Sequence, residues 1–265
     1  MRLEDGVSAH GAAPGEVLVL HGFTHVLAQE DVRRHVMACL SPEEEARRRA
    51  FAFPRDRDMF LLAHGVMRLA LGRVMGVGPR DLAFTRDAYG KPFLAGPFEA
   101  GPGFSLSHSG QAIAIAIARA PQVGVDVEAH GREVPLEAMA MVMADAEVAD
   151  LAASGGSARR KAFAYWTLRE AFAKAVGLGL SLPRNAVSFR LGGQGPAGEG
   201  APAVAHLSEQ FGTAGDWHLH QCDLGPDHIL AVAARVPGPV AWRLLPIESV
   251  LPCAGSVRAP ARPVP

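Results

Sequence analysis

Two carboxylates end an apolar stretch of this chain, "VGVDVE" at residues 123–128. Residues two apart on a strand share a face, so Asp126 and Glu128 project side by side while Val125 and Val127 point into the core. Like charges this close repel, and a divalent cation relieves the repulsion. Mg²⁺ takes one or two carboxylates and completes its shell with water and phosphate oxygens. The pair is a candidate metal site; a solvated strand edge is the alternative.

A second constellation lies in "FAYWTLREAFAKAVG", residues 163–177. Trp166, Glu170 and Lys174 are spaced i, i+4 and i+8, which puts an aromatic ring, an acid and a base on one face of a helix. Such a stripe can serve a polar site. It can also be a half-buried tryptophan beside a surface ion pair worth about 0.2–0.5 kcal/mol.

Other polar groups are less specific. His108 stands between serines in "SLSHSG", but neighbouring side chains on a strand diverge and no G-x-S-x-G elbow is present, which disfavours a serine hydrolase. A cluster of arginines is either a solvated helix face or a set of phosphate ligands, since guanidinium groups bind phosphate bidentately. The cluster comprises Arg47, Arg48, Arg49, Arg55 and Arg57.

The elements that position these residues follow from periodicity and capping signals. "SPEE" predicts a helix start, with Ser41 as N-cap, Pro42 at the first position and Glu44 completing a capping box. "AIAIAIA" at 112–118 predicts a central strand buried on both faces. Further helices are expected at about 29–40, 56–75 and 157–177, and further strands at "EVLVLHGF", "DLAFT", "FSLSHS", "QVGVDVE", "AVSFRL", "WHLHQCDL" and "HILAVAAR".

The echo of "FSLSHSGQAIAIAIAR" by "WHLHQCDLGPDHILAVAAR" suggests two α+β halves of similar build, with a single α+β domain as the alternative. We expect a flexible tail at 1–15, an N-terminal α/β subdomain at 16–120, a C-terminal subdomain at 121–236 that carries the acidic motifs, and a Pro-rich tail at 237–265.

Composition narrows the class of protein. With 26 Lys and Arg against 27 Asp and Glu, the net charge of −1 gives no global field that favours nucleic acid or anionic membranes. The start "MRLEDG" lacks the apolar core of a signal peptide, and no apolar run is long enough to span a bilayer. Cys39, Cys222 and Cys253 lie far apart without a C-x-x-C pair. A soluble, cytoplasmic protein is expected.

Four motifs in order, "YGKPFL", "FSLSHSG", "VGVDVE" and "WTLREAFAKAVGLGLSLP", resemble the Sfp-type 4′-phosphopantetheinyl transferases over about Ser41 to Leu191, with a weaker continuation to Arg235. The resemblance implies a pseudodimer of two similar subdomains, each a small antiparallel sheet packed with a long helix. It implies transfer of phosphopantetheine from coenzyme A, the substrate, to a serine of an apo acyl or peptidyl carrier protein. Mg²⁺, with Mn²⁺ as a substitute, is the implied cofactor, and a monomer is expected.

The resemblance also assigns residues. Asp126, Glu128 and Glu170 match the family's metal-binding acids, of which Glu170 is a candidate base. Lys174 matches a lysine suited to the pyrophosphate. His108 and Lys91 match residues that contact coenzyme A phosphates. The remaining matches are Arg47 with Arg55 or Arg57 for the 3′-phosphate or adenine side, Arg169 for phosphate, and Glu147 in a helix between the main motifs.

Arg169 departs from the family, which most often has lysine there; arginine keeps the charge but cannot readily transfer a proton. One alternative function is therefore a coenzyme A- or carrier-binding module without catalysis. Another is a different Mg²⁺-dependent phosphotransferase that uses the same acids. The "WTLREA" form favours carriers of polyketide or nonribosomal peptide synthesis.

Overall fold

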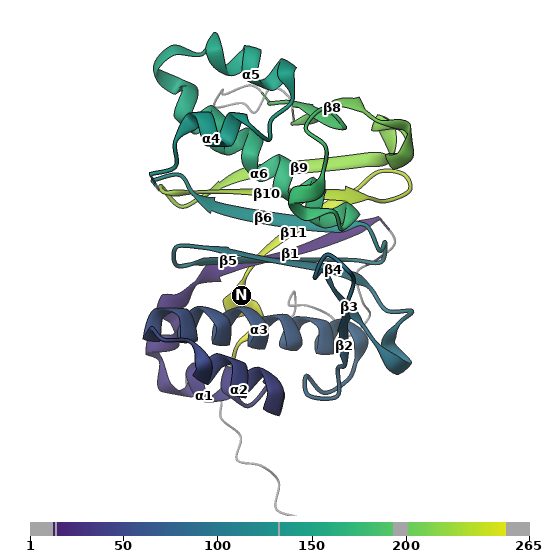
Figure 1. Cartoon of the computed structure of the whole chain (residues 1–265). Helices are drawn as coiled ribbons and strands as arrows, with labels where there is room; N and C mark the ends of the chain where they lie inside the picture. Colours follow the sequence, from purple (N-terminus) through teal and green to yellow (C-terminus); the bar gives the residue numbers. More distant parts are fainter. Residues whose placement is uncertain (1–12, 14, 132, 193–200, 253–265) are drawn as a thin grey trace, which may run out of the picture.

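The computed structural model describes residues 13, 15–131, 133–192 and 201–252. Figure 1 shows four layers: the helices α1–α3, a sheet containing β1, β5 and β4, a second sheet containing β6, β10 and β9, and the helix α6 with α4 and α5. The two sheets face each other in the middle of the molecule. This is the α+β fold of two halves that the sequence predicts.

The N-terminal half is a four-stranded sheet in the order β11-β1-β5-β4. Its strands are β1 (Glu16–Phe23), β4 (Gly103–Ser109), β5 (Ala112–Ala118) and β11 (Ala241–Pro246). The long helix α3 (Pro54–Met75) covers its outer face, and α1 (Glu30–Met37) and α2 (Pro42–Ala50) pack beside it (Figure 1). A small hairpin of β2 (Phe84–Arg86) and β3 (Pro92–Leu94) completes this half.

Strand β5 explains how one sheet packs on both a helix and another sheet. Its isoleucines, such as Ile115, belong to the core under α3, whereas its alanines, such as Ala114, belong to the core between the two sheets. The bulky side chains fill the wide space to the helix, and the small ones let the sheets approach. The prediction that this strand is buried on both faces is confirmed, since every residue of it is buried.

The C-terminal half contains the antiparallel sheet β6-β10-β9. Its strands are β6 (Val123–Ala129), β9 (Trp217–Leu224) and β10 (His228–Arg235), and the long helix α6 (Ala158–Val176) covers their outer face (Figure 1). The shorter elements are α4 (Leu136–Ala140), α5 (Asp145–Ala152) and the hairpin of β7 (Val187–Arg190) and β8 (Ala203–Leu207). No helix of the described residues is long and apolar enough to cross a membrane.

The local signals around α2 are confirmed. Ser41 accepts a hydrogen bond from the backbone N–H of Glu44, and the Glu44 side chain accepts from the N–H of Ser41, which is the capping box that "SPEE" predicts. Helix α3 begins at Pro54, two residues before its expected start, because proline at the first turn needs no hydrogen-bonded N–H.

Two predicted boundaries need correction. Residues 241–251, expected in a Pro-rich tail, form β11 and a 3-10 turn: β11 pairs in parallel with β1, and Ile247 and Val250 are fully buried against the N-terminal half. Arg73 of α3 donates to the carbonyls of Ser249 and Val250 at 2.8 Å each. Strand β8 lies between the predicted strands "AVSFRL" and "WHLHQCDL" and has no counterpart among the predicted strands. Residues 1–12, 14 and 253–265 of the two predicted tails lie outside the described residues.

Candidate active site at the seam between the halves

Helix α6 approaches strand β6 unusually closely, and Gly124 makes this possible. A Cβ atom at this position would collide with the backbone carbonyl of Ala171 and lie 2.5 Å from the backbone nitrogen of Ala175. Only glycine leaves room for the helix backbone here. The close packing brings Glu170 and Lys174 of α6 over the acids of β6.

Asp126 is the buried centre of this arrangement, with 3% of the residue exposed. Its Oδ1 accepts hydrogen bonds from the hydroxyl of Ser107 at 2.8 Å and from the ammonium of Lys174 at 2.7 Å. Its Oδ2 is buried and has no hydrogen-bond partner among the described residues. Burial raises the pKa of Asp126, and the charge of Lys174 opposes this shift. Lys174 is thus the positive charge that most directly favours the ionised form of Asp126 against the effect of burial.

Glu128 and Glu170 add negative charge beside Asp126. Glu128 accepts a hydrogen bond from the hydroxyl of Ser109 at 2.6 Å. Burial raises the pKa of Glu170, and the nearby charges of Asp126 and Glu128 raise it further, while Lys174 lowers it. Three carboxylates close enough to perturb one another, one with an unpartnered buried oxygen, are suited to a divalent cation.

The described residues include no set of three His, Cys, Asp or Glu side chains placed to hold a metal ion by themselves. This does not conflict with Mg²⁺, which needs only one or two carboxylates and otherwise binds water and phosphate oxygens. The free Oδ2 of Asp126 and the neighbouring Glu128 and Glu170 therefore fit such an ion, whose remaining positions water or phosphate oxygens fill.

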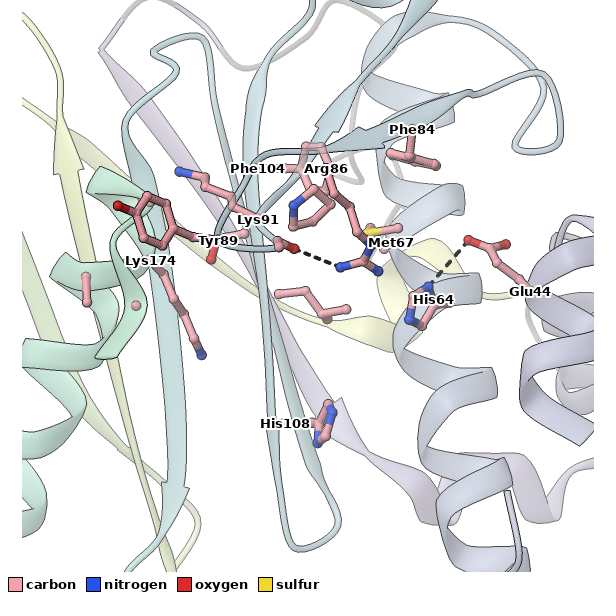
Figure 2. A pocket seen from close by; sticks show the side chains of 17 residues that line it. Glu44, His64, Met67, Phe84, Arg86, Tyr89, Lys91, Phe104, His108 and Lys174 are labelled. Atoms are coloured by element: carbon pink, nitrogen blue, oxygen red, sulfur yellow. Dashed lines mark hydrogen bonds and ion pairs between the residues drawn. The ribbon is translucent and has the colours of Figure 1, made fainter. Parts of the chain in front are cut away.

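A cavity of about 370 Å³ is lined by Lys174, the residue whose ammonium contacts Asp126. Figure 2 shows that Lys174 reaches it from the C-terminal half, while Lys91, Arg86 and His108 come from the N-terminal half. Apolar side chains such as Phe104 form part of its wall. A pocket that combines apolar walls with lysine, arginine and histidine is suited to a ligand with a ring system and phosphates.

Lys91 and His108, for which the resemblance predicts contacts with coenzyme A, both line this cavity. The ammonium of Lys91 donates to the carbonyl of Ala175 at 2.8 Å, at the C-terminal end of α6. Burial lowers the pKa of Lys91 to about 8. Burial and the charge of Lys174 lower the pKa of His108, so its imidazole is neutral at pH 7. Both roles remain predictions.

The predicted arginines are placed differently from one another. Arg55 lines a second cavity of about 940 Å³, which shares His64 and His108 with the first. Arg47 lies with its guanidinium 5.5 Å from the ring of Phe60. Arg57 donates to the carbonyl of Phe51 at 2.9 Å. Of these three arginines, Arg55 is the one that lines either cavity.

The resemblance implies that Arg169 contacts phosphate, but the structure places this side chain away from the cavity. Arg169 is buried and donates to the backbone carbonyls of Val187, Pro183 and Arg184, so its guanidinium faces the loop after α6. Glu147 lies 3.8 Å from it. The pair fastens this loop and β7 to the helix, and neither residue lines the cavity between the halves.

Sequence reasoning missed the serines that hold the acids. In the sequence, Ser107 and Ser109 stand out only as the neighbours of His108. In the structure, their side chains contact Asp126 and Glu128. The available signal was the alternation in "FSLSHS", because serines two apart on a strand share one face. Glu44 and Arg86, which also line the first cavity, carried no comparable signal.

Comparisons with known proteins show which family the chain resembles. Residues 122–233 match the family model described as "4′-phosphopantetheinyl transferase superfamily". Residues 28–120 match the model "4′-phosphopantetheinyl transferase, N-terminal". The border between the two matches falls between β5 and β6, where the two halves of the structure meet.

Individual relatives carry the same name. The chain is 34% identical over 155 residues to the 4′-phosphopantetheinyl transferase HetI of Nostoc sp., covering 57% of this chain and 65% of HetI. It is 31% identical over 166 residues to the 4′-phosphopantetheinyl transferase Sfp of Bacillus subtilis, covering 62% and 72%. A phosphopantetheinyl transferase of Thraustochytrium sp. is 28% identical over 235 residues, covering 80% and 78%. The match to HetI thus spans just under two thirds of that relative.

Proposed function

This chain belongs to the 4′-phosphopantetheinyl transferase superfamily, and we propose that it transfers the 4′-phosphopantetheine moiety of coenzyme A to a serine of an apo acyl or peptidyl carrier protein. The products are the holo carrier and 3′,5′-ADP. One observation carries the proposal: a buried Asp126 with a free Oδ2 lies beside Glu128, Glu170 and Lys174, where a cavity with basic walls meets both halves.

The reaction we propose is an in-line attack of the carrier serine oxygen on the β-phosphate of coenzyme A, and the enzyme contributes mainly position and charge. Lys174 neutralises charge on the pyrophosphate as the bond to 3′,5′-ADP breaks. Glu170 is the candidate acceptor for the serine proton, since its raised pKa moves it toward the range of an effective base. His108 and Lys91 hold the phosphates on the opposite wall.

We assign Asp126, Glu128 and Glu170 as the residues that would hold Mg²⁺, or Mn²⁺ in its place. When bound there, the ion supplies positive charge for the phosphate oxygens. The ligand set is all oxygen, which suits these hard cations.

The alternative of a module without catalysis is not favoured. Its main motivation was Arg169 in place of lysine, and that side chain is occupied by three backbone carbonyls away from the cavity. The departure from the family pattern therefore carries no argument against transfer. A phosphotransferase of another kind is also not favoured, because the relatives are named 4′-phosphopantetheinyl transferases.

The test is to mix the protein with coenzyme A, Mg²⁺ and a panel of apo carrier proteins, and to follow each carrier by mass spectrometry. We expect the mass gain of one phosphopantetheine group, which is lost when EDTA is added. Carriers whose acceptor serine is replaced by alanine are the matched control. No gain on any carrier in the panel would refute the function.

The panel also addresses the finer predictions. Carriers of polyketide and nonribosomal peptide synthesis are proposed as acceptors, and faster loading of a fatty-acid carrier would contradict this. A monomeric state and a cytoplasmic location remain predictions. Light scattering, which measures the molecular mass in solution, tests the monomeric state.

A further inference from the structure

Three serines on β4 form a ladder between the two halves. Ser105, Ser107 and Ser109 alternate along the strand and point toward β6, and all three are buried. Two of them donate to the candidate metal acids: Ser107 to Asp126 and Ser109 to Glu128. The third, Ser105, instead accepts a hydrogen bond at 3.1 Å from the backbone nitrogen of Val125.

We propose that Ser107 and Ser109 are positioning residues that fix the carboxylates of Asp126 and Glu128 for a divalent cation. The inference rests on the proposed function, because that function assigns the two acids to the ion. Its content is distinct: the N-terminal half builds the metal site of the C-terminal half through two hydroxyl groups.

The hydrogen-bond capacity of each hydroxyl explains why the orientation is definite. A serine hydroxyl has one proton to donate and two lone pairs to accept. Ser109 accepts from the backbone N–H of Ala129 at 3.2 Å, so its proton is left for Glu128. Ser107 accepts from the ammonium of Lys174 at 2.7 Å, so its proton is left for Asp126. Each serine is thereby set to donate to a carboxylate.

The two carboxylate oxygens of Asp126 therefore have different contacts. Ser107 and Lys174 both contact Oδ1, whereas Oδ2 is buried without a partner among the residues that the structure describes. A carboxylate fixed through one oxygen presents the other in a constant direction. Groups that orient metal ligands in this way commonly change metal affinity by about 10- to 100-fold when they are removed.

The test uses Mn²⁺ alone as the probe, without coenzyme A or carrier. Free Mn²⁺ is counted by electron paramagnetic resonance during a titration of the full chain and of Ser107→Ala and Ser109→Ala. We expect each variant to bind Mn²⁺ about tenfold or more weakly. Ser105→Ala is the matched control, since it removes a buried hydroxyl of the same strand that touches no acid; its Mn²⁺ affinity should be unchanged.

Thermal unfolding separates positioning from packing. All three alanine variants lose one buried hydroxyl and should unfold at similarly lower temperatures. Only the Mn²⁺ affinity should then distinguish the Ser107 and Ser109 variants from the Ser105 variant. Ser107→Thr keeps a hydroxyl and should restore the affinity. Should Ser107→Ala fail to fold, Ser109→Ala still decides, because Glu128 is only partly buried.

Equal Mn²⁺ affinity in Ser107→Ala, Ser109→Ala and the unchanged protein would overturn the inference, as would no binding by the unchanged protein. Failure of the proposed function looks different. In that case no carrier is loaded, while the unchanged protein binds Mn²⁺ and the two variants bind it more weakly.

Discussion

Two of the contacts between the halves have opposite chemistry. At the first, which we call the serine seam, β4 meets β6, and Ser107 and Ser109 donate to Asp126 and Glu128. At the second, the aromatic seam, His220 of β9 lies against Trp242 of β11 with ring centroids 5.4 Å apart. The His220 Nε2 is buried there and finds no hydrogen-bond partner among the described residues.

The difference shows what a buried polar group requires. At the serine seam, carboxylates that would be costly to bury accept hydrogen bonds from hydroxyls of one half, and Asp126 also accepts one from Lys174 of the other half. At the aromatic seam, the partly buried imidazole of His220 packs against Trp242, and burial lowers its pKa. At the serine seam the carboxylates of β6 meet donors from both halves, which is the reason we propose the candidate site between β4 and β6.

The largest effect is expected from removing an acid at the serine seam. Asp126→Ala or Glu170→Ala should lower kcat for transfer by about 100- to 1,000-fold, because charge that is preorganised for the reacting pyrophosphate is lost. The free energy of unfolding should not fall, since burial raises the pKa of both acids and removing either one relieves repulsion. Mass spectrometry of carrier loading and urea unfolding measure the two quantities.

Asp223→Ala is the matched control for these variants. Asp223 lies on β9 in an exposed ion pair with Arg160, away from the serine seam. Exposed ion pairs contribute about 0–1 kcal/mol, so both rate and stability should change little. An Asp126→Ala protein that loads carriers at the normal rate would remove the functional difference between the seams.

A smaller effect is expected from Gly124→Ala. The added methyl group meets the backbone of Ala171 and Ala175, so α6 must move away from β6. Overpacking of this kind costs roughly 1–3 kcal/mol. Displacing Glu170 and Lys174 by about 1 Å can lower the rate as much as 100-fold. Urea unfolding and the loading assay should therefore both respond.

Gly156→Ala controls for the chemistry of the substitution. A Cβ at Gly156 would meet no atom within 4 Å. This variant should keep normal stability and transfer. If Gly124→Ala behaved in the same way, the close approach of helix and strand would not be what brings α6 to the serine seam.

The sequence predicts those parts of the serine seam that follow from the repeat of side-chain directions within one strand or one helix. The strand period of two places Asp126 and Glu128 together, and the helix period places Glu170 and Lys174 together. The same period puts Arg169 about 100° around α6 from Glu170, so a site that uses Glu170 and Lys174 leaves Arg169 facing elsewhere. The family resemblance had suggested otherwise, and the placement of Arg169 follows the helix geometry.

The parts that could not be predicted depend on contacts between distant segments. Gly124 looks like an ordinary strand glycine until α6 is known to cross β6. Residues 241–251 have the composition of a tail, yet they pair with β1 at the other end of the chain. The role of the β4 serines depends on the strand that they face. In each hydroxyl–carboxylate pair, the serine and the acid are 19 residues apart in the sequence.

The smallest effect is expected at the aromatic seam. Burial lowers the pKa of His220 below its ordinary value of 6.5, so the folded protein keeps this imidazole neutral while the unfolded chain binds a proton as pH falls through 6.5. Stability from this group is thus complete above pH 6.5 and is lost below it, by about 1.4 kcal/mol per pH unit until the folded pKa is reached.

His220→Leu should therefore gain stability relative to the unchanged protein as the pH falls from 7.5 to 5.5, by at most about 1.4 kcal/mol. At pH 7.5 the variant also loses an unpaired buried nitrogen, which itself costs about 1–3 kcal/mol, so stability should not fall. Carrier loading should be unchanged, because His220 touches no residue of the serine seam. Urea unfolding at the two pH values is the measurement, with His206→Leu, an exposed histidine of β8, as control. A loss of transfer in His220→Leu would show that the aromatic seam affects the serine seam. It would contradict the conclusion that only the serine seam takes part in transfer.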